Sequence, residues 1–268
     1  MARQMYPDIQ GTFVNTGLEY PEIVRFVKSL PNIQIIRPKM SFKEVLDKYG
    51  YPVISKDVSA AVHELTNGTT EHIRNKRLYG YGKTGVGKLP LKYRYLLNAP
   101  FKISSYCCNV LKKQPLNRYY EETGLYPMVG VMAEESRLRL TSYTLYSCNA
   151  FNLKTPQGRP MMFWKKEDTM RYLKQYGIDY CKDIYGEILE NPDGSLMFEK
   201  EDRTGCTFCM FGVHLEKSPN RFQRLQVTHP QLWKYCLEDL GLKPVLEYLG
   251  VPYKNEQLDM FKELKEGE

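Results

Sequence analysis

Four cysteines in two pairs are the residues of this chain best suited to chemistry. Cys107 and Cys108 are adjacent, whereas Cys206 and Cys209 form a C-x₂-C pair, and residues 109–205 separate the two pairs. Four thiolates are the full ligand set of one [4Fe–4S] cluster or one structural Zn²⁺. Adjacent cysteines reach one tetrahedral ion awkwardly, but they can bind different irons of a cubane. The pattern therefore predicts a [4Fe–4S] cluster, with zinc or ordinary buried thiols as the alternatives.

The elements that would position these cysteines begin as alternating strands and helices. Residues 11–15 and 33–36 are predicted as short strands, and Ser41 caps a helix through about Tyr49, with Glu44 completing a capping box. The helix between the strands has an apolar face of Ile23, Phe26, Val27 and Leu30. Strands and helices that alternate at short spacing indicate an α/β fold with an open, mostly parallel sheet and flanking helices.

Further elements follow along the chain. Residues 127–132 and 150–153 are predicted as a third and a fourth strand, and residues 191–194 as a turn. The helix predicted over residues 165–176 directs Met170, Leu173 and Tyr176 inward. The helices predicted beyond Cys209 cover residues 219–226, 230–240 and 243–248.

The predicted domain organisation has one boundary. Residues 1–186 are predicted as an α/β nucleotide-binding-like domain, in which residues 57–100 are a mobile basic insertion. Residues 187–268 are predicted as a C-terminal, mostly helical region that is linked to the first domain by the metal site.

The composition indicates a soluble globular protein. The 268 residues are 42% hydrophobic and 26% charged, and no apolar run approaches the roughly 18 residues that span a bilayer. The N-terminus lacks a signal-peptide pattern, and the seven cysteines show no regular disulfide framework. These features predict a cytoplasmic protein without a membrane partner, whose thiols are free or metal-bound.

Positive charge is concentrated in the middle of the chain. The net charge is +7, and residues 74–113 contain ten lysines and arginines but no acidic residue. Tyrosines alternate with these cations, which suits a nucleotide, a sulfate group or a nucleic-acid backbone; a solvated basic loop is the alternative. Residues 82–89 nearly spell a Walker A loop. However, Leu89 replaces the Mg²⁺-binding hydroxyl, Pro90 follows, and no strand precedes the loop, which argues against a P-loop.

Five segments occur in a distinctive order. Residues 13–21 read FVNTGLEYP, residues 106–116 read YCCNVLKKQPL, and residues 130–139 read GVMAEESRLR. Residues 160–172 carry Pro, Trp, Asp and Tyr at every fourth position, and residues 205–209 read GCTFC. Together these segments resemble the cluster-bearing branch of the phosphoadenosine-phosphosulfate reductase family, which belongs to the adenine-nucleotide α-hydrolase-like proteins.

The resemblance implies a nucleotide site at the carboxyl ends of the parallel strands. It implies that Asn15, Thr16 and Gly17 approach the adenosine of an adenine nucleotide or sulfonucleotide. The residues that it assigns to the phosphate or sulfate, or to orienting the cations there, are Lys112, Glu135, Ser136, Arg137 and Arg139. It also implies a [4Fe–4S] cluster on the four cysteines, and either sulfonucleotide reduction or ATP-dependent sulfur transfer, with a thiol or electron donor as partner.

Two departures from the family pattern limit this expectation. The family's phosphate loop would precede residue 13, and the chain is expected to begin after it and so to bind nucleotide weakly. The family's C-terminal nucleophile is also missing. Cys236 lies on a predicted helix, and Cys148 and Cys181 have no neighbouring histidine to activate them. The alternative function is therefore a non-catalytic module that binds nucleic acid or a protein partner, with a structural Cys₄ metal site.

Overall fold

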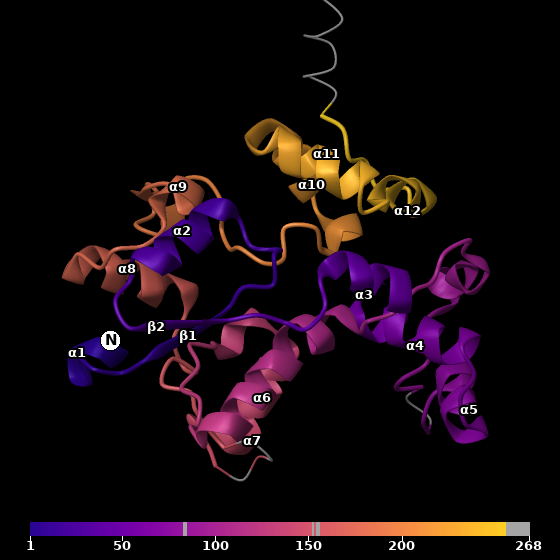
Figure 1. Cartoon of the computed structure of the whole chain (residues 1–268), viewed down its shortest axis with the longest axis horizontal. Helices are drawn as coiled ribbons and strands as arrows, with labels where there is room; N and C mark the ends of the chain where they lie inside the picture. The colour runs from indigo at the N-terminus through magenta and orange to yellow at the C-terminus, as the bar shows by residue number, and fades with distance from the viewer. Residues whose placement is uncertain (83–84, 152, 154–155, 256–268) are drawn as a thin grey trace, which may run out of the picture. The chain divides into compact units, whose positions relative to one another are not determined.

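The computed structural model describes residues 1–82, 85–151, 153 and 156–255, and it is a mixed α/β protein (Figure 1). Its contacts divide the chain into two compact units. Unit 1 consists of Met1–Asn15, Glu19–Ile36 and Pro115–Thr204. Unit 2 consists of Thr16–Leu18, Arg37–Gln114 and Gly205–Glu268, which is described as far as residue 255. The units interleave along the chain, so a single sequence boundary between residues 186 and 187 does not reproduce this division.

The first strands of unit 1 pair as predicted. Strand β1 (Gly11–Val14) runs parallel to β2 (Ile33–Ile36), with Gly11 opposite Ile33 and Val14 opposite Ile36. Helix α2 (Pro21–Ser29) connects them and starts at a proline, whose fixed φ suits the first helical position. Helix α1 (Ala2–Met5) precedes this strand–helix–strand unit.

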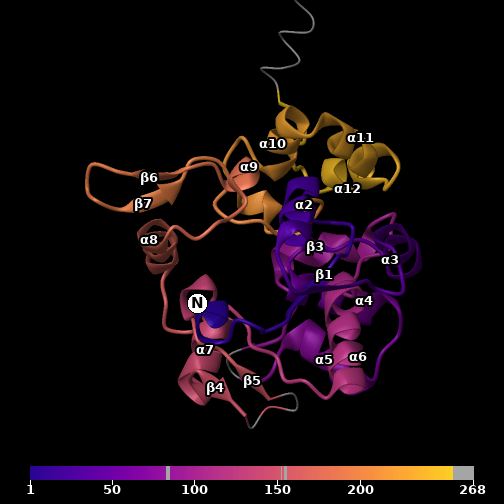
Figure 2. The same ribbon diagram turned by 60° about the vertical axis from the view of Figure 1, so that its left-hand side comes forward.

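A hairpin and a helix form a small core in unit 1. Strands β6 (Ile188–Glu190) and β7 (Leu196–Phe198) are antiparallel (Figure 2), and the predicted turn between them contains Gly194 at a φ of 79°. Helix α8 (Lys166–Tyr176) buries Met170 against the hairpin, and Leu173 packs beside it, as predicted. Tyr176 is 54% exposed, so its predicted inward position is wrong, because it lies at the end of the helix before Gly177. Short helix α9 (Lys182–Tyr185) leads into the hairpin.

The predicted third and fourth strands are much reduced. Residues 127–132 make one isolated parallel bridge, between Met128 and Gly158. Strand β4 (Asn149–Ala150) pairs antiparallel with β5 (Gln157–Gly158), and residue 152 of the predicted fourth strand lies outside the described residues. The remaining elements here are α6 (Gln114–Thr123), the 3₁₀ turn Ala133–Glu135 and α7 (Arg137–Tyr146).

The described residues form four two-stranded sheets, so the predicted open sheet is not confirmed. Two of these pairs, β1–β2 and β3–β8, are parallel. No helix in the described part of the chain is both long and apolar enough to span a bilayer.

Unit 2 begins with a capped helix. Helix α3 (Phe42–Tyr49) has the predicted capping box, in which Ser41 Oγ accepts from the Glu44 N–H and Glu44 accepts from the Ser41 N–H. Strand β3 (Val53–Ile54) pairs in parallel with β8 (Met210–Phe211).

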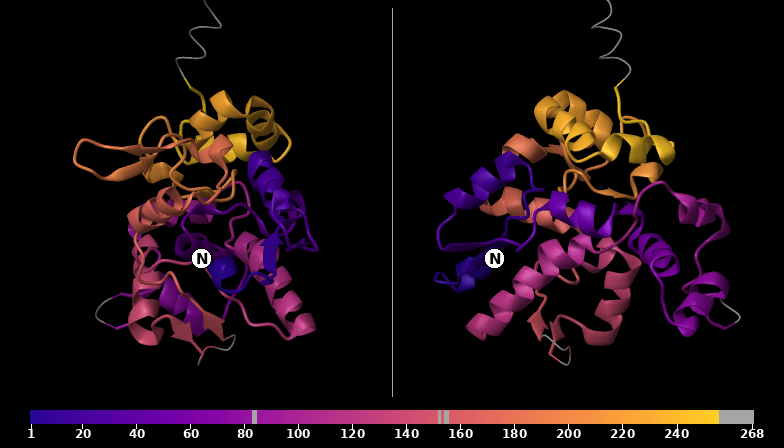
Figure 3. Two further views of the ribbon diagram at one scale, coloured as in Figure 1. Left: turned by 90° about the vertical axis from the view of Figure 1, so that its left-hand side faces the viewer. Right: turned by 45° about the vertical axis from the view of Figure 1, so that its right-hand side comes forward.

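Helices close unit 2 at its C-terminal end. They are α10 (Arg221–Thr228), α11 (Pro230–Glu238) and α12 (Leu242–Tyr248), which follow the 3₁₀ turn Val213–Leu215. Helix α11 contacts both α10 and α12, and the three form the yellow group in Figure 3. Their boundaries all lie within two residues of those predicted, and the first begins at Arg221 after an Asn220 cap.

The segment predicted as a mobile basic insertion is folded. It contains α4 (Lys56–Thr66), α5 (Glu71–Tyr79) and the 3₁₀ helix Leu91–Asn98. Leu89 and Leu96 are both 1% exposed, and burial of such side chains fixes a segment in place. The Walker-like glycine loop follows helix α5 rather than a strand, which agrees with its rejection as a P-loop; residues 83 and 84 lie outside the described residues.

Candidate metal centre

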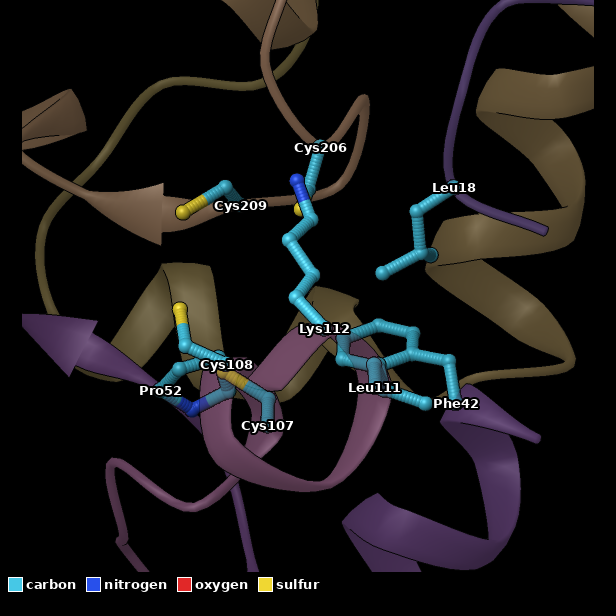
Figure 4. Close-up of a pocket in the computed structure, with 9 residues that line it drawn as sticks. All are labelled: Leu18, Phe42, Pro52, Cys107, Cys108, Leu111, Lys112, Cys206 and Cys209. Atoms are coloured by element: carbon cyan, nitrogen blue, oxygen red, sulfur yellow. The ribbon is translucent and has the colours of Figure 1, made fainter. Parts of the chain in front are cut away.

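All four predicted cysteine ligands line one pocket in unit 2 (Figure 4). The space between the lining atoms is about 320 Å³, including the part that opens to solvent. The other lining residues are Leu18, Phe42, Pro52, Leu111 and Lys112. The structure therefore gathers two cysteine pairs that are distant in sequence into one apolar pocket, with one lysine among the thiols.

A widened helical turn presents the first cysteine pair. Cys107 and Cys108 lead into the π-helical turn Asn109–Lys113, and the N–H groups of Asn109 and Val110 both donate to the Tyr106 carbonyl at 2.9 Å. Four side chains of this short stretch line the pocket: Cys107, Cys108, Leu111 and Lys112. π-Helical turns are rare and are often found at functional sites.

The second cysteine pair is fixed by three sets of hydrogen bonds. Within the loop, the Cys209 N–H donates to the Cys206 carbonyl at 3.0 Å. The backbone N–H and the hydroxyl of Thr207 both donate to the Leu18 carbonyl, at 2.8 and 2.7 Å. Arg221 Nη1 donates to the Cys209 carbonyl at 2.8 Å. This loop is therefore anchored both to the segment around Leu18 and to helix α10.

Strand pairing aligns the two halves of the site. The second cysteine pair continues directly into β8, and β8 pairs with β3, where Val53 and Met210 are fully buried. Ile54, at the end of β3, has a φ of 61°, a conformation that β-branched residues rarely adopt. The resulting turn leads through Ser55 into α4, whose first residue is Lys56.

Hydrogen bonding and lysine charges give the thiols different proton affinities. A hydrogen bond from Cys107, with the ammonium groups of Lys56 and Lys112, lowers the pKa of Cys108 to about 6 against the effect of burial. The same bond, followed by burial, raises the pKa of Cys107. Burial also raises the pKa of Cys206 and Cys209, and at Cys206 the positive charge of Lys112 opposes this rise. Of the four thiols, Cys108 is therefore the one that loses its proton most readily.

The donor set fits a thiophilic metal centre. Four cysteine sulfurs in apolar surroundings suit an iron–sulfur cluster or Zn²⁺ and suit hard cations poorly. As they are placed, no three Cys, His, Asp or Glu side chains among the described residues form a closed shell around one ion. The Lys112 side chain extends between the cysteines toward Cys206 (Figure 4), so a bound centre would require it to move aside.

The predicted adenosine-binding turn lies beside this pocket in unit 2. Thr16 is buried, and its Oγ1 accepts from the Leu18 N–H at 3.2 Å. Gly17 has a φ of 77°, and apart from its two chain neighbours no atom of the described residues lies within 4 Å of where a Cβ would be. Asn15 belongs to unit 1, where its N–H donates to the Ile36 carbonyl at 2.9 Å. Because Leu18 lines the pocket, residues 16–18 connect the turn directly to the cysteine site.

The predicted phosphate-binding residues fall in both units. Lys112 lies among the thiols, whereas the remaining four belong to unit 1. There, Ser136 caps α7 and its Oγ accepts from the Arg139 N–H at 3.3 Å. Glu135 forms an ion pair with Arg139, the orienting role expected of it, and Arg137 is exposed.

The three remaining cysteines differ in their access to solvent. Cys236 is fully buried and donates to the Trp233 carbonyl at 3.2 Å, and burial raises its pKa to about 12. Burial also raises the pKa of Cys181. Cys148 is partly exposed. Neither buried thiol is suited to act as a nucleophile at neutral pH.

Sequence reasoning did not single out two cationic residues, Lys56 beside the cysteine pocket and the buried Arg159. Lys56 reaches Cys108 from the start of α4, and no motif in the sequence pointed to it. Arg159 is only 6% exposed, although arginine is rarely buried without a partner. Its position immediately before Pro160, the first residue of one family-like segment, was the available signal.

No protein-family model matches the chain, and no curated protein matches it either. The resemblance to phosphoadenosine-phosphosulfate reductases thus depends on the order and content of the five sequence motifs.

Proposed function

We propose that this chain is an iron–sulfur protein of the phosphoadenosine-phosphosulfate reductase family that acts on an adenine nucleotide or sulfonucleotide. The observation that carries this proposal is the gathering of all four cysteines in one pocket, with a hydrogen-bonded link from Thr207 to Leu18. Because that link joins the cysteine loop to residues 16–18, a metal centre and a nucleotide-binding turn would be neighbours in unit 2.

The two cysteine pairs, Cys107 with Cys108 and Cys206 with Cys209, would hold the cluster. When bound, a cluster supplies electrons or holds a sulfur atom for transfer. Zinc is the alternative occupant, because the same four thiolates bind it. Cysteine binds metal as the thiolate, so metal binding releases the protons that these thiols still carry, and affinity is expected to rise with pH.

The chain's own cations complement this role. A cluster on four thiolates is negatively charged, and the ammonium groups of Lys56 and Lys112 lie beside two of these sulfurs. They offset the negative charge of the ligand set, which favours retention of an electron-rich centre. Gly17 leaves its side of the turn open, so a ligand can approach the backbone closely there.

Metal analysis of anaerobically purified protein tests the cluster. We expect about four irons and four sulfides per chain, because a [4Fe–4S] core has that composition. The Cys107→Ala variant is expected to lose all four irons together. One zinc per chain would reject the cluster, and protein without iron or zinc would reject both metal centres.

Cys148→Ala is the matched control for this experiment. Cys148 is a partly exposed cysteine of unit 1, outside the pocket, so its removal should leave the iron content unchanged. Equal iron loss in the two variants would show that the four-cysteine assignment is wrong.

Product analysis separates the two reactions that the family resemblance implies. With an added dithiol as the reductant, reduction of adenosine 5′-phosphosulfate releases sulfite and AMP while the dithiol is oxidised to a disulfide, whereas activation of an acceptor by ATP for sulfur transfer releases pyrophosphate. We expect one of these products from the iron-loaded protein and none from Cys107→Ala. Iron-loaded protein that yields neither product, and binds neither nucleotide, would overturn the nucleotide part of the proposal but not the metal centre.

Nucleic-acid binding is the second candidate function. Helix α5 and the following turn expose Tyr79 and Tyr81, which are 70% and 44% exposed, and Arg74 is exposed on the same helix. The Lys76 ammonium lies 5.1 Å from the centre of the Tyr81 ring. Exposed rings among cations suit stacking on the bases of a single strand.

Fluorescence anisotropy with a labelled 20-nucleotide DNA or RNA strand tests this second function. We expect binding that weakens steeply between 50 and 200 mM salt, and a further loss of roughly tenfold in the Tyr79→Ala, Tyr81→Ala double variant. Tyr176→Ala removes an exposed tyrosine of unit 1 and should bind normally. Affinity that is independent of salt and of both tyrosines would exclude this function.

A further inference from the structure

Arg221 links the second cysteine pair to helix α10. Its Nη1 donates to the Cys209 carbonyl at 2.8 Å. Its other edge is held by Glu216, whose Oε1 accepts from Nε at 2.7 Å and also from Nη2. The guanidinium therefore has a fixed orientation, with one nitrogen directed at the cysteine loop. All of these residues belong to unit 2.

The position of Arg221 is unusual for an arginine. It is the first residue of α10, where the helix dipole disfavours a positive charge. Glu216 offsets this effect, because its Oε2 also accepts from the Arg221 backbone N–H at 2.8 Å. The two side chains are only 23% and 25% exposed, so solvent screens this ion pair less than it screens a pair on the surface. A cation placed and paired in this way points to a role in the loop that its Nη1 contacts.

The cysteine loop depends on an anchor outside itself. Cys107 and Cys108 lead into a helical turn that fixes their backbone, whereas residues 205–209 contain no helix or strand. The Cys209 N–H donates to the Cys206 carbonyl at 3.0 Å, and the Cys209 carbonyl accepts from Arg221. Hydrogen bonds thus hold the planar peptide groups on both sides of Cys209, and these two groups fix the direction of its Cα–Cβ bond.

Two groups also face the Cys209 sulfur. Burial raises the pKa of this thiol, and a hydrogen bond from the Phe211 N–H and the positive charge of Arg221 oppose the rise. Hydrogen bonds to ligand sulfurs and the charges around them tune iron–sulfur centres. Arg221 therefore acts on Cys209 twice, through the carbonyl that it holds and through the charge that it places near the sulfur.

We infer that Arg221 is a positioning residue of the proposed metal centre: its Nη1 holds the Cys209 carbonyl and so keeps the Cys209 sulfur directed into the shared pocket, while Glu216 holds the guanidinium. Arginine suits this task better than lysine, because a guanidinium offers separate N–H groups to a carboxylate on one edge and to a carbonyl on the other. The inference deepens the proposed function and rests on it, since only a bound centre uses the direction of this sulfur.

Hydrogen exchange in full-length, metal-free protein tests the anchoring by itself. We expect the Cys209 amide to exchange on the order of tenfold faster in Arg221→Gln, because the loop opens more often once the bond to its carbonyl is lost. Glu216→Gln releases the guanidinium from its carboxylate but leaves the arginine in place, so a smaller acceleration is expected. Arg224→Gln is the matched control. It removes an arginine of the same helix whose Nη1 donates to the Pro219 carbonyl, and the Cys209 amide should exchange as in the wild type.

Iron content after mild oxidation tests the positioning. Full-length variants are loaded with iron and sulfide under anaerobic conditions and are then briefly oxidised. A cluster whose fourth thiolate is misdirected loses the iron at that corner, so Arg221→Gln and Arg221→Lys should retain about three irons per chain and show the electron paramagnetic resonance of a [3Fe–4S] cluster. Wild type and Arg224→Gln should retain about four irons. A variant that was merely less stable would instead bind fewer clusters, all of the four-iron type.

The outcomes separate this inference from the function on which it rests. A four-iron cluster that survives oxidation in Arg221→Gln, or Cys209 exchange that this variant leaves unchanged, would overturn the inference while the metal centre stands. Wild-type protein that binds no iron would overturn the proposed function, and the positioning role with it. If Arg221→Gln fails to fold, the same two measurements on Arg221→Lys decide, and wild-type behaviour of that variant would overturn the inference.

Discussion

The two units of this protein bury their apolar residues to different extents. In unit 1, the described residues bury eight hydrophobic side chains: Ala133, Ala150, Met162, Met170, Cys181, Ile184, Leu196 and Phe198. Unit 2 contains the other buried hydrophobic residues, including Phe222, Leu242 and Leu246, which are fully enclosed. Large exposed apolar side chains occur in both units, for example Leu138 at 83% and Phe163 at 62% in unit 1 and Leu215 at 76% in unit 2.

This difference separates two ways of building a binding site. The cysteine pocket of unit 2 lies in a well-packed interior, where its ligand loops are anchored by backbone hydrogen bonds. Arg137 and Arg139, two of the predicted phosphate-binding residues, lie instead on α7 of unit 1, a helix that buries none of its residues. We therefore expect unit 2 to be rigid before its ligand arrives and unit 1 to be stabilised by its ligand.

The largest expected effect comes from removing a core side chain of unit 2. Phe222→Ala deletes a fully buried ring on α10, and such deletions cost about 4 kcal/mol of unfolding free energy. The two tryptophans allow each unit to be followed, because Trp164 lies in unit 1 and Trp233 in unit 2. In urea titrations of single-tryptophan variants, the unfolding transition that Trp233 fluorescence reports should move to a lower urea concentration.

The control for this experiment is a phenylalanine of unit 1. Phe163→Ala removes an exposed ring and should change the unfolding free energy by no more than about 0.5 kcal/mol. If both variants were equally destabilised, or if Phe222→Ala affected only the Trp164 signal, the contrast between the units would be wrong.

An intermediate effect is expected from the ion pairs that attach α5 to α4. Arg77 has a side-chain exposure of 8%, and it pairs with Asp57 at 2.9 Å and with Glu64 at 2.5 Å. Because both carboxylates are partly solvated, Arg77→Ala should lower the free energy of unfolding by about 2 kcal/mol. This is less than the loss expected for a fully buried ion pair. Urea unfolding followed through Trp233 measures this change.

Arg74 provides the comparison within the same helix. It is exposed, so the free energy of unfolding of Arg74→Ala should lie within about 0.5 kcal/mol of the wild-type value. A larger loss for Arg74→Ala than for Arg77→Ala would mean that charge density, rather than these ion pairs, stabilises the segment.

The smallest expected effect concerns the reactivity of Cys108. In metal-free protein its pKa is lowered to about 6, so the thiolate predominates above that pH and the alkylation rate should fall as the pH drops through 6. Lys56→Met removes a nearby positive charge and should raise the midpoint by about 1 pH unit. Iodoacetamide labelling, resolved by tandem mass spectrometry, measures the rate at each pH.

Lys243→Met is the matched control for the labelling experiment. Lys243 is an exposed lysine of α12 in unit 2, outside the cysteine pocket, so the Cys108 midpoint should stay near pH 6. A midpoint that does not respond to Lys56→Met would show that this ammonium does not stabilise the thiolate.

The elements that sequence could predict are those with strong local signals. The Ser41–Glu44 capping box, the parallel pair of residues 11–14 and 33–36, and helix α8 all agree with the structure. Each depends on interactions between residues close in sequence or on a clear apolar period. The two cysteine pairs were visible for the same reason, because their spacing is a local pattern.

The features that sequence could not predict depend on distant contacts. Strands β3 and β8 contain two residues each, too few to show an alternating pattern, and their pairing joins residues far apart in the chain. In the sequence, Arg77 belongs to a basic stretch without acidic residues. Only the fold shows that it pairs with Asp57 and Glu64, which precede that stretch. The place of Lys56 beside Cys108 is likewise a product of tertiary structure.

The pairing of β3 with β8 has a consequence for the order in which this protein is assembled. During synthesis, Cys107 and Cys108 leave the ribosome long before Cys206 and Cys209, and at about 5–20 residues per second the delay is on the order of 5–20 s. Throughout this interval the first cysteine pair lacks its partner loop, and Cys108 is a thiol that the finished fold turns into a thiolate. The metal centre proposed above would therefore bind all four cysteines only in chains that have been translated through β8 and have closed this long loop.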